Sequence, residues 1–285
     1  MDRRAFLQQS MVGAAAAPAL GTARGGHAPR REPLANDYTV LWKASDPAGE
    51  IGYCPALARL STGRLIGCML RAGPQADKQR SWTVKVHTSD DRGRTWVHRT
   101  DAAMIDCFPF VAGSSVYVIG GRYDLTILRS DDHGDTWSAP VKLTSDKLWY
   151  SHPGSAVYAN GRIYFVMEQI MEPIPHGFPV HVFAPVVLSA RATDDLTRPE
   201  AWTFSNSLSF QDVLREHGEP KLLGVPFYAP GRYKHPTTYR GMAPIGWGET
   251  NLVRITDPAH VWHDPAGHTF HLLARANTGR TNLAC

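Results

Sequence analysis

Residues that can transfer protons or bind anions recur at matching places along the chain. Asp106 and Glu249 each open an apolar run, and Asp77 lies in a polar loop. Carboxylates can act as general acids and bases, because burial and neighbouring charges move their pKa values toward neutrality. Arg71 and Arg275 could hold an anionic group through paired N–H donors. Together these five residues suit acid–base chemistry on an anionic sugar.

Three further residues complete the candidate set. Tyr53 and His152 also open apolar runs and could hydrogen-bond a neutral or differently charged sugar, although each could equally be a core residue. Glu168, which ends another apolar run, is a second candidate acid, and a rim ion pair is its simplest alternative. The thirteen histidines and four cysteines have no metal-ligand spacing. We therefore expect no metal and no other cofactor.

The segments that must position these residues are short apolar runs in pairs, each pair divided by a turn with glycine, asparagine or aspartate. The pairs cover residues 54–57 and 65–68, 108–111 and 116–120, 154–158 and 163–166, and 249–254 and 270–275. Such runs are typical of strands, and no stretch has the periodicity of an amphipathic helix. The composition and pattern predict an all-β fold.

Two copies of one motif set the repeat length. Residues 89–96 and 130–137 both follow the pattern S-x-D-x-G-x-T-W, 41 residues apart. About 40 residues is the length of one four-stranded propeller blade. We expect Asp90 and Asp131 to accept hydrogen bonds from N–H groups of a tight turn, and the glycines to adopt φ > 0. A carboxylate satisfied by its own turn is not free for catalysis, so the motifs are expected to be structural.

Two later segments vary this pattern. Residues 192–203 form a degenerate third copy that keeps the acidic turn and a tryptophan but lacks the glycine. Residues 205–246 form a long segment rich in Pro, Gly, Tyr and His, in which we expect irregular structure. A loop of this length is usually functional or a lid, and a disordered linker is the alternative.

The repeated motif resembles the Asp-box, or BNR repeat, of the sialidase (neuraminidase) superfamily, and the resemblance covers roughly residues 50–285. It implies a six-bladed β-propeller, of which this chain accounts for about three and a half blades and is incomplete at its C-terminus. Either the chain is a fragment, or its open sheet edge is covered by a partner or a rearranged terminus.

The resemblance also implies roles. In this superfamily an aspartate is the acid/base, a glutamate takes the proton of a nucleophilic tyrosine, and arginines bind the sugar carboxylate. Asp77 would be the acid/base, Glu249 the base for the tyrosine, and Arg71 and Arg275 the substrate ligands. The superfamily's first arginine is missing, because residues 53–55 read Tyr-Cys-Pro. No residue here matches its third arginine or its tyrosine.

The resemblance therefore implies an exo-sialidase-like glycoside hydrolase that removes terminal sialic acid, or a related acidic sugar, from glycoconjugates. The alternative is a non-catalytic Asp-box propeller that binds glycans or proteins. A net charge of +4, from 30 basic and 26 acidic residues scattered along the chain, does not favour a nucleic-acid partner. The sequence does not indicate an oligomeric state.

The N-terminus resembles a twin-arginine export signal, in which Arg3 and Arg4 precede an Ala-rich apolar run that ends at Leu20. We expect a signal peptide at residues 1–25, a lead-in at 26–49 and the propeller domain at 50–285. The protein would be periplasmic or secreted, with no membrane span after signal removal. A signal retained as an anchor is the alternative.

The cysteines are too few for a disulfide scaffold in a chain of this length. An oxidising compartment would permit one bridge, for which Cys54 and Cys107 are candidates because they open successive apolar runs.

Overall fold

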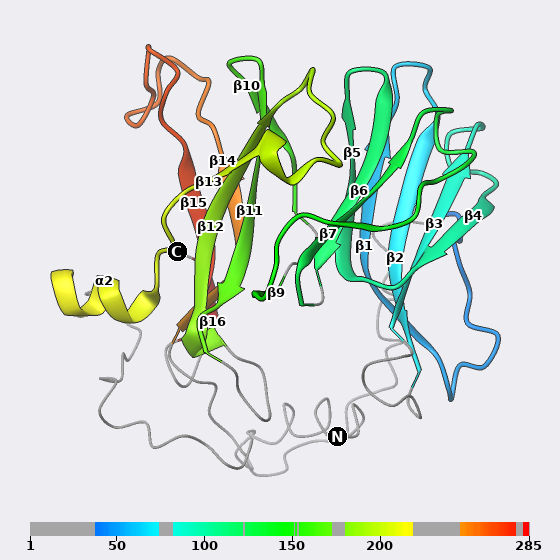
Figure 1. The fold of residues 1–285 in the computed structure, drawn as a ribbon, viewed down its shortest axis with the longest axis horizontal. Helices are drawn as coiled ribbons and strands as arrows, with labels where there is room; N and C mark the ends of the chain where they lie inside the picture. Colours follow the sequence, from blue (N-terminus) through cyan, green and yellow to red (C-terminus); the bar gives the residue numbers. More distant parts are fainter. Residues whose placement is uncertain are drawn as a thin grey trace, which may run out of the picture. The chain divides into compact units, whose positions relative to one another are not determined.

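The structure is a computed structural model, and it describes residues 38–73, 82–121, 123–150, 152, 154–172, 180–218, 246–277 and 282–284. Within these residues the chain forms four antiparallel sheets in chain order, coloured from blue to red in Figure 1. The predicted mostly-β class is confirmed, and so are successive antiparallel sheets with four strands. The number of blades stays a prediction. The expected signal peptide lies outside the described residues.

The first two sheets each contain four strands in sequential order. The first sheet consists of β1 (Ile51–Arg59), β2 (Leu65–Ala72), β3 (Thr83–Ser89) and β4 (Val97–Ala102). The second sheet consists of β5 (Ile105–Ala112), β6 (Ser115–Gly121), β7 (Leu125–Ser130) and β8 (Val141–Lys142). Each strand therefore pairs with the strand that precedes it, as in a meander.

The third sheet has the same order but a divided first strand. It consists of β9 (Leu148–Tyr150), β10 (Val157–Ala159), β11 (Arg162–Ile170), β12 (Phe183–Arg191) and β13 (Trp202–Phe204), and both β9 and β10 pair with β11. The fourth sheet consists of β14 (Gly246–Val253), β15 (His271–Asn277) and β16 (Asn282–Ala284). The described helices are η1 (Val180–Val182), η2 (Pro199–Ala201) and α2 (Phe210–His217).

Apolar side chains fill the space between successive sheets. One buried cluster joins strands of the first and second sheets and includes Ile66 and Val118. A second cluster joins the second and third sheets, where the rings of Phe110 and Phe165 meet edge to face with centroids 4.7 Å apart. Aromatic pairs of this kind add to the free energy gained by burying apolar area. The sheets are thus held face to face, which fixes the relative positions of their first strands.

The two Asp-box turns have the expected shape but use a different carboxylate. In the first box, Asp91 accepts hydrogen bonds from the Thr95 backbone N–H at 2.8 Å and from the Thr95 hydroxyl at 2.6 Å. Asp132 makes the same two contacts in the second box. The glycines Gly93 and Gly134 have φ of 85° and 93°, as predicted.

The prediction that Asp90 and Asp131 close these turns was wrong. Asp90 instead forms an ion pair with Arg64 at 2.7 Å, and Asp131 forms one with Arg129 at 2.8 Å. The third residue of the box faces the N–H group four residues later, whereas the second residue points away from the turn. The local geometry of the turn, and not the charge alone, selects the closing carboxylate.

Neutralising the closing carboxylate should destabilise the protein in a pH-dependent way. Hydrogen bonds from the Thr95 side chain and backbone lower the pKa of Asp91 to about 2. Stability from this group is present above its unfolded pKa of 3.8 and is lost as the pH falls through about 2. Asp91→Asn should therefore lower the melting temperature by a few degrees at neutral pH, and the deficit should shrink in acid. Circular dichroism melts measure this, and an equal loss in Asp90→Asn would contradict it.

The third box and the segment that follows it agree with the sequence predictions only in part. In the degenerate third box, Asp195 accepts a hydrogen bond from the Thr197 N–H at 3.1 Å, and the Trp202 indole donates to the Leu196 carbonyl at 2.9 Å. The acidic turn and its tryptophan are thus retained. The expectation of irregular structure after residue 205 was wrong for α2, which begins where the Ser209 hydroxyl accepts a hydrogen bond from the Asp212 N–H. Residues 219–245 lie outside the described residues.

Candidate functional site

In each of the four sheets, the hydrogen-bonded pairing between the first strand and the next one is broken at one place. β1, β5 and β14 each contain one extra residue relative to their partner strand. At the break a non-glycine residue adopts a left-handed backbone, with φ of 53° at Cys54, 46° at Asp106 and 54° at Glu249. Such a conformation costs of order 1–3 kcal/mol and redirects the side chain out of the ladder. In the third sheet the interruption separates β9 from β10, and His152 lies in the gap.

Asp106 lies at the centre of the group that these interruptions create. Its side chain is 1% exposed and accepts a hydrogen bond from the Cys54 thiol. The pKa of Asp106 is raised to about 6, because burial and the negative charges of Glu168 and Glu249 outweigh the lowering effects of Cys54 and His152. Asp106 therefore shares one electrostatic neighbourhood with residues from the first, third and fourth sheets. Its carboxyl group holds a proton in mildly acidic solution.

His152 and Glu168 form a buried pair that reaches from the third sheet to the fourth. The Nδ1 atom of His152 lies 3.1 Å from Oε2 of Glu168, and its Nε2 donates to the Thr250 carbonyl at 2.9 Å. Oε1 of Glu168 accepts the Thr250 N–H at 2.7 Å. The alternative of a rim ion pair for Glu168 is wrong, because this residue is fully buried.

Glu249 and Arg275 form the exposed part of the site. The Nη1 atom of Arg275 lies 2.8 Å from Oε1 of Glu249, and the side chains are 28% and 40% exposed, respectively. Arg275 is paired with Gly248 across β14 and β15, directly before the break that turns Glu249 out of the strand. A partly exposed guanidinium can exchange its carboxylate partner for an anionic ligand.

Tyr150 belongs to the same group and was not identified from the sequence. Its ring stacks on Phe183 with centroids 4.9 Å apart. Burial raises the pKa of Tyr150 above its ordinary value of 10, and Asp106, Cys54 and Glu249 raise it further. A signal was available, because Tyr150 ends its strand two residues before His152.

The remaining predicted residues have contacts with other residues or fall outside the described residues. Arg71 forms an ion pair with Glu50 in the segment before β1, which holds the pKa of Glu50 below its ordinary value. Tyr53 packs its ring edge against Trp82 at 6.1 Å. Asp77 falls outside the described residues. The structure thus brings together Asp106, His152, Glu168, Glu249 and Arg275.

The cysteine bridge considered from the sequence is not formed. Cys54, Cys68 and Cys107 are all free thiols. The left-handed backbone at Cys54 directs its thiol to Asp106. The buried thiol of Cys107 instead forms a hydrogen bond with the thiol of Cys68. Burial raises the pKa of Cys107, with the neighbouring Cys68 adding to the shift. The two cysteines that the strand pattern had suggested as a pair therefore have different hydrogen-bond partners.

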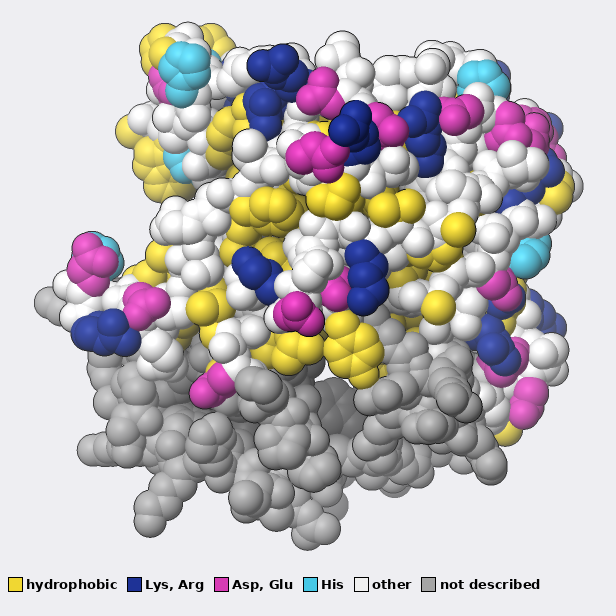
Figure 2. All heavy atoms as spheres, in the orientation of Figure 1, with side chains coloured by type: hydrophobic (Ala, Val, Ile, Leu, Met, Phe, Trp, Pro, Cys, Tyr) yellow, Lys and Arg dark blue, Asp and Glu magenta, His cyan; other side chains and the backbone are white. Residues whose placement is uncertain are grey.

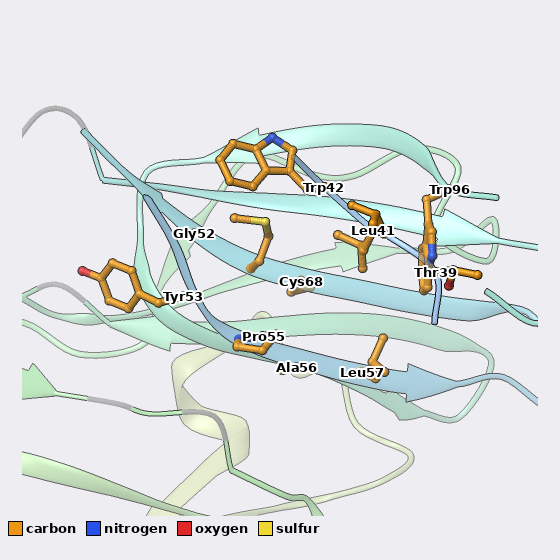
Figure 3. A pocket seen from close by; sticks show the side chains of 12 residues that line it. Thr39, Leu41, Trp42, Gly52, Tyr53, Pro55, Ala56, Leu57, Cys68 and Trp96 are labelled. Carbon is orange, nitrogen blue, oxygen red and sulfur yellow. The ribbon is translucent and has the colours of Figure 1, made fainter. Parts of the chain in front are cut away.

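An apolar groove lies beside the site, on the first sheet. Its volume is about 580 Å³, and it runs between residues 39–42, β1 and Trp96 (Figure 3). Tyr53 stands at one end of this groove, with its hydroxyl directed away from the other lining side chains. The lining contains no Asp, Glu, Lys or Arg. The groove accordingly offers no carboxylate for acid–base chemistry.

The described residues carry mixed surface charge and no cluster of metal-binding side chains. On the described part of the face in Figure 2, Lys and Arg side chains are interspersed with Asp and Glu, so that part carries no continuous basic patch. No group of three or more His, Cys, Asp or Glu residues among those described is arranged to hold a metal ion. The described part of the chain also contains no helix with both the length and the apolar character needed to span a bilayer.

Comparisons with known proteins identify similar folds. No family model matches the chain, and no curated protein matches it. The structure is similar to an α-L-arabinofuranosidase from Lactobacillus brevis, with a TM-score of 0.51 and 12% identity over 86% of this chain and 76% of that one.

Two other solved structures are more distant. The GH93 α-L-arabinofuranosidase of Fusarium graminearum has a TM-score of 0.42 and 11% identity over 82% of this chain and 65% of that chain. The Trypanosoma rangeli sialidase has a TM-score of 0.42 and 10% identity over 79% of this chain and 29% of its own. At these identities the likeness concerns the fold alone.

Proposed function

We propose that this chain carries the sugar site of an exported exo-acting glycoside hydrolase that removes a terminal sialic acid or a related acidic sugar. The observation that supports the proposal most is the arrangement of Glu249 and Arg275 beside buried Asp106. Arg275 would bind the sugar carboxylate. Glu249 would accept a proton and Asp106 would hold one beside it, while Asp77 keeps the acid/base role that the resemblance implies.

The different surroundings of the two carboxyl groups support this chemistry. Asp106 is buried and has a pKa of about 6, so it can hold a proton where an ordinary aspartate is ionised. Glu249 instead is partly exposed and lies 2.8 Å from the guanidinium of Arg275. A pair of carboxyl groups in contrasting environments is the usual basis for separate acid and base roles. Tyr150 is the tyrosine that shares this neighbourhood, and Glu249 would take its proton.

A non-catalytic glycan-binding propeller is the second candidate, and two observations favour it. Residues 53–55 lack the arginine of the sialidase pattern. Arg71, the other proposed ligand near the first sheet, is already paired with Glu50. Fewer guanidinium groups facing the sugar would weaken the recognition of a carboxylate.

Hydrolysis of fluorogenic sugars tests these alternatives. Purified protein should release methylumbelliferone from its sialoside, and Asp77→Ala should remove that activity, because Asp77 is the proposed acid/base. An arabinofuranoside of the same fluorophore serves as the neutral-sugar comparison. Release from the arabinofuranoside alone would reject the acidic-sugar assignment. Saturable binding on a glycan array without any release would favour the binding propeller.

The export part of the proposal is tested at the twin arginines. Replacing Arg3 and Arg4 with lysine should lower the periplasmic or secreted amount by about tenfold, because the export machinery reads the arginine pair. Cell fractionation measures the distribution, and the intact mass of the exported form should correspond to cleavage near residue 25. Unchanged export of the double variant would contradict the proposal.

A further inference from the structure

The break in β14 leaves the backbone N–H and C=O of one residue dependent on side chains of another sheet. Pairing between β14 and β15 stops at Gly248 and resumes at Asn251, so Thr250 lies outside the register of the ladder. Its N–H donates to Glu168 at 2.7 Å, and its carbonyl accepts from His152 at 2.9 Å. Both contacts are buried, and they hold the residue directly after Glu249.

The hydrogen-bond geometry defines the protonation state of His152. Its Nε2 faces a carbonyl oxygen, which can only accept, and its Nδ1 faces the carboxylate of Glu168. With Glu168 as a carboxylate, both ring nitrogens carry hydrogens and the ring is an imidazolium. Burial by itself lowers the pKa of His152, but the hydrogen bond and charge of Glu168, the Thr250 carbonyl and Glu249 outweigh it, and the pKa is raised above 6.5.

We infer that His152 and Glu168 are positioning residues, whose charged pair clamps the Thr250 peptide and thereby holds Glu249 in its left-handed conformation against Arg275. The catalytic consequence rests on the proposed function. The clamp itself involves only residues of this chain, so it is expected whichever sugar binds. Because Thr250 follows Glu249, movement of this peptide would swing the Glu249 side chain away from Arg275.

The clamp depends on pH through His152. Below the folded pKa the imidazolium donates to both acceptors, and this contribution is lost as the pH rises through that pKa, when Nδ1 and the Glu168 carboxylate would both be acceptors. Three charged groups on other elements act on His152, namely Glu168 of β11, Glu249 of β14 and Asp106 of β5. All three are acidic, so each favours the charged ring when ionised.

Glu168→Gln tests whether the clamp requires the carboxylate charge or only the hydrogen bonds. The glutamine oxygen can still accept the Thr250 N–H, and its amide can donate to Nδ1 of a neutral His152. The variant should therefore keep every hydrogen bond while no longer requiring the imidazolium. It should fold normally and stay active in alkaline solution, where the wild type loses the clamp.

The experiment compares pH profiles on two readouts. As the pH rises through the folded pKa of His152, wild-type kcat should fall about tenfold with a smaller change in KM, whereas Glu168→Gln should change less than about twofold. Hydrogen exchange at the Thr250 amide, corrected for its intrinsic pH dependence, should accelerate over the same range in the wild type only. Asp124→Asn is the matched control, because Asp124 is another buried carboxylate that accepts a backbone N–H, from Lys147; it should keep the wild-type profiles.

The two readouts separate the clamp from the proposed function. If no glycoside is cleaved, the proposed function fails while Thr250 exchange and the His152 titration, followed by NMR, still decide the clamp. A folded-state pKa of His152 below 6.5 would overturn the inference. So would identical Thr250 exchange profiles in the wild type and Glu168→Gln.

Discussion

Glu249→Gln is expected to lower kcat/KM on the cleaved glycoside by about 1,000-fold, within the range that a general acid or base contributes. Glutamine has nearly the same shape, so the ladder and the bulge should remain. It cannot accept a proton, and it removes the charge that faces Arg275 at 2.8 Å. The loss should appear mainly in kcat, because the proton transfer occurs in the transition state.

Steady-state kinetics measures this effect, and another glutamate–arginine pair provides the control. Glu200 of η2 lies 2.6 Å from Arg198, which directly precedes η2, and both side chains are exposed. Glu200→Gln should leave kcat/KM within about twofold of the wild type, since exposed pairs contribute little. A Glu249→Gln protein within about tenfold of the wild type would remove Glu249 from the proposed chemistry.

Arg275 extends this test. If Arg275 holds the substrate and also orients Glu249, replacing it with methionine should raise KM and lower kcat together. The double variant with Glu249→Gln should be scarcely worse than Glu249→Gln alone, because residues that act as a unit are not additive. Additive losses would instead indicate two independent roles.

Asp106→Asn is expected to stabilise the protein at neutral pH by about 3 kcal/mol. A pKa that rises from 3.8 to about 6 corresponds to that free energy, at 1.36 kcal/mol for each unit. Between these values the folded state keeps a proton that the unfolded chain has released, so wild-type stability falls as the pH rises through this window. Asparagine carries no charge to bury and can still accept the Cys54 hydrogen bond.

Urea denaturation at about pH 7.5 and about pH 4 measures the difference. The gain should be nearly absent at the lower pH, where Asp106 is protonated in the folded state. Asp124→Asn should have the opposite sign: burial raises the pKa of Asp124, but hydrogen bonds from Lys142, the Lys147 N–H and Thr144 lower it overall. A loss of stability in Asp106→Asn at pH 7.5 would show that the carboxylate is well solvated. Greater stability with weaker activity would be the usual compromise at a functional site.

Local sequence patterns were sufficient for several features of the fold. The spacing of the two boxes predicted successive four-stranded sheets, and the turn glycines adopt the expected positive φ. The apolar runs also placed Asp106 and Glu249 on the first strands of their sheets, whereas His152 lies between β9 and β10. These features could be inferred because each depends on residues that are close in the sequence: a box closes its turn with hydrogen bonds spanning four residues.

Long-range packing determined the chemistry of the site, which no local pattern encodes. The Glu168 to Thr250 hydrogen bond spans 82 residues. The raised pKa of Asp106 arises from burial among residues of other sheets. Bulges directed Cys54 to Asp106 instead of Cys107, because one extra residue changes which way a side chain points. A linear pattern identifies which groups are available, but their protonation and partners depend on solvent exclusion and on charges that only the packed sheets bring together.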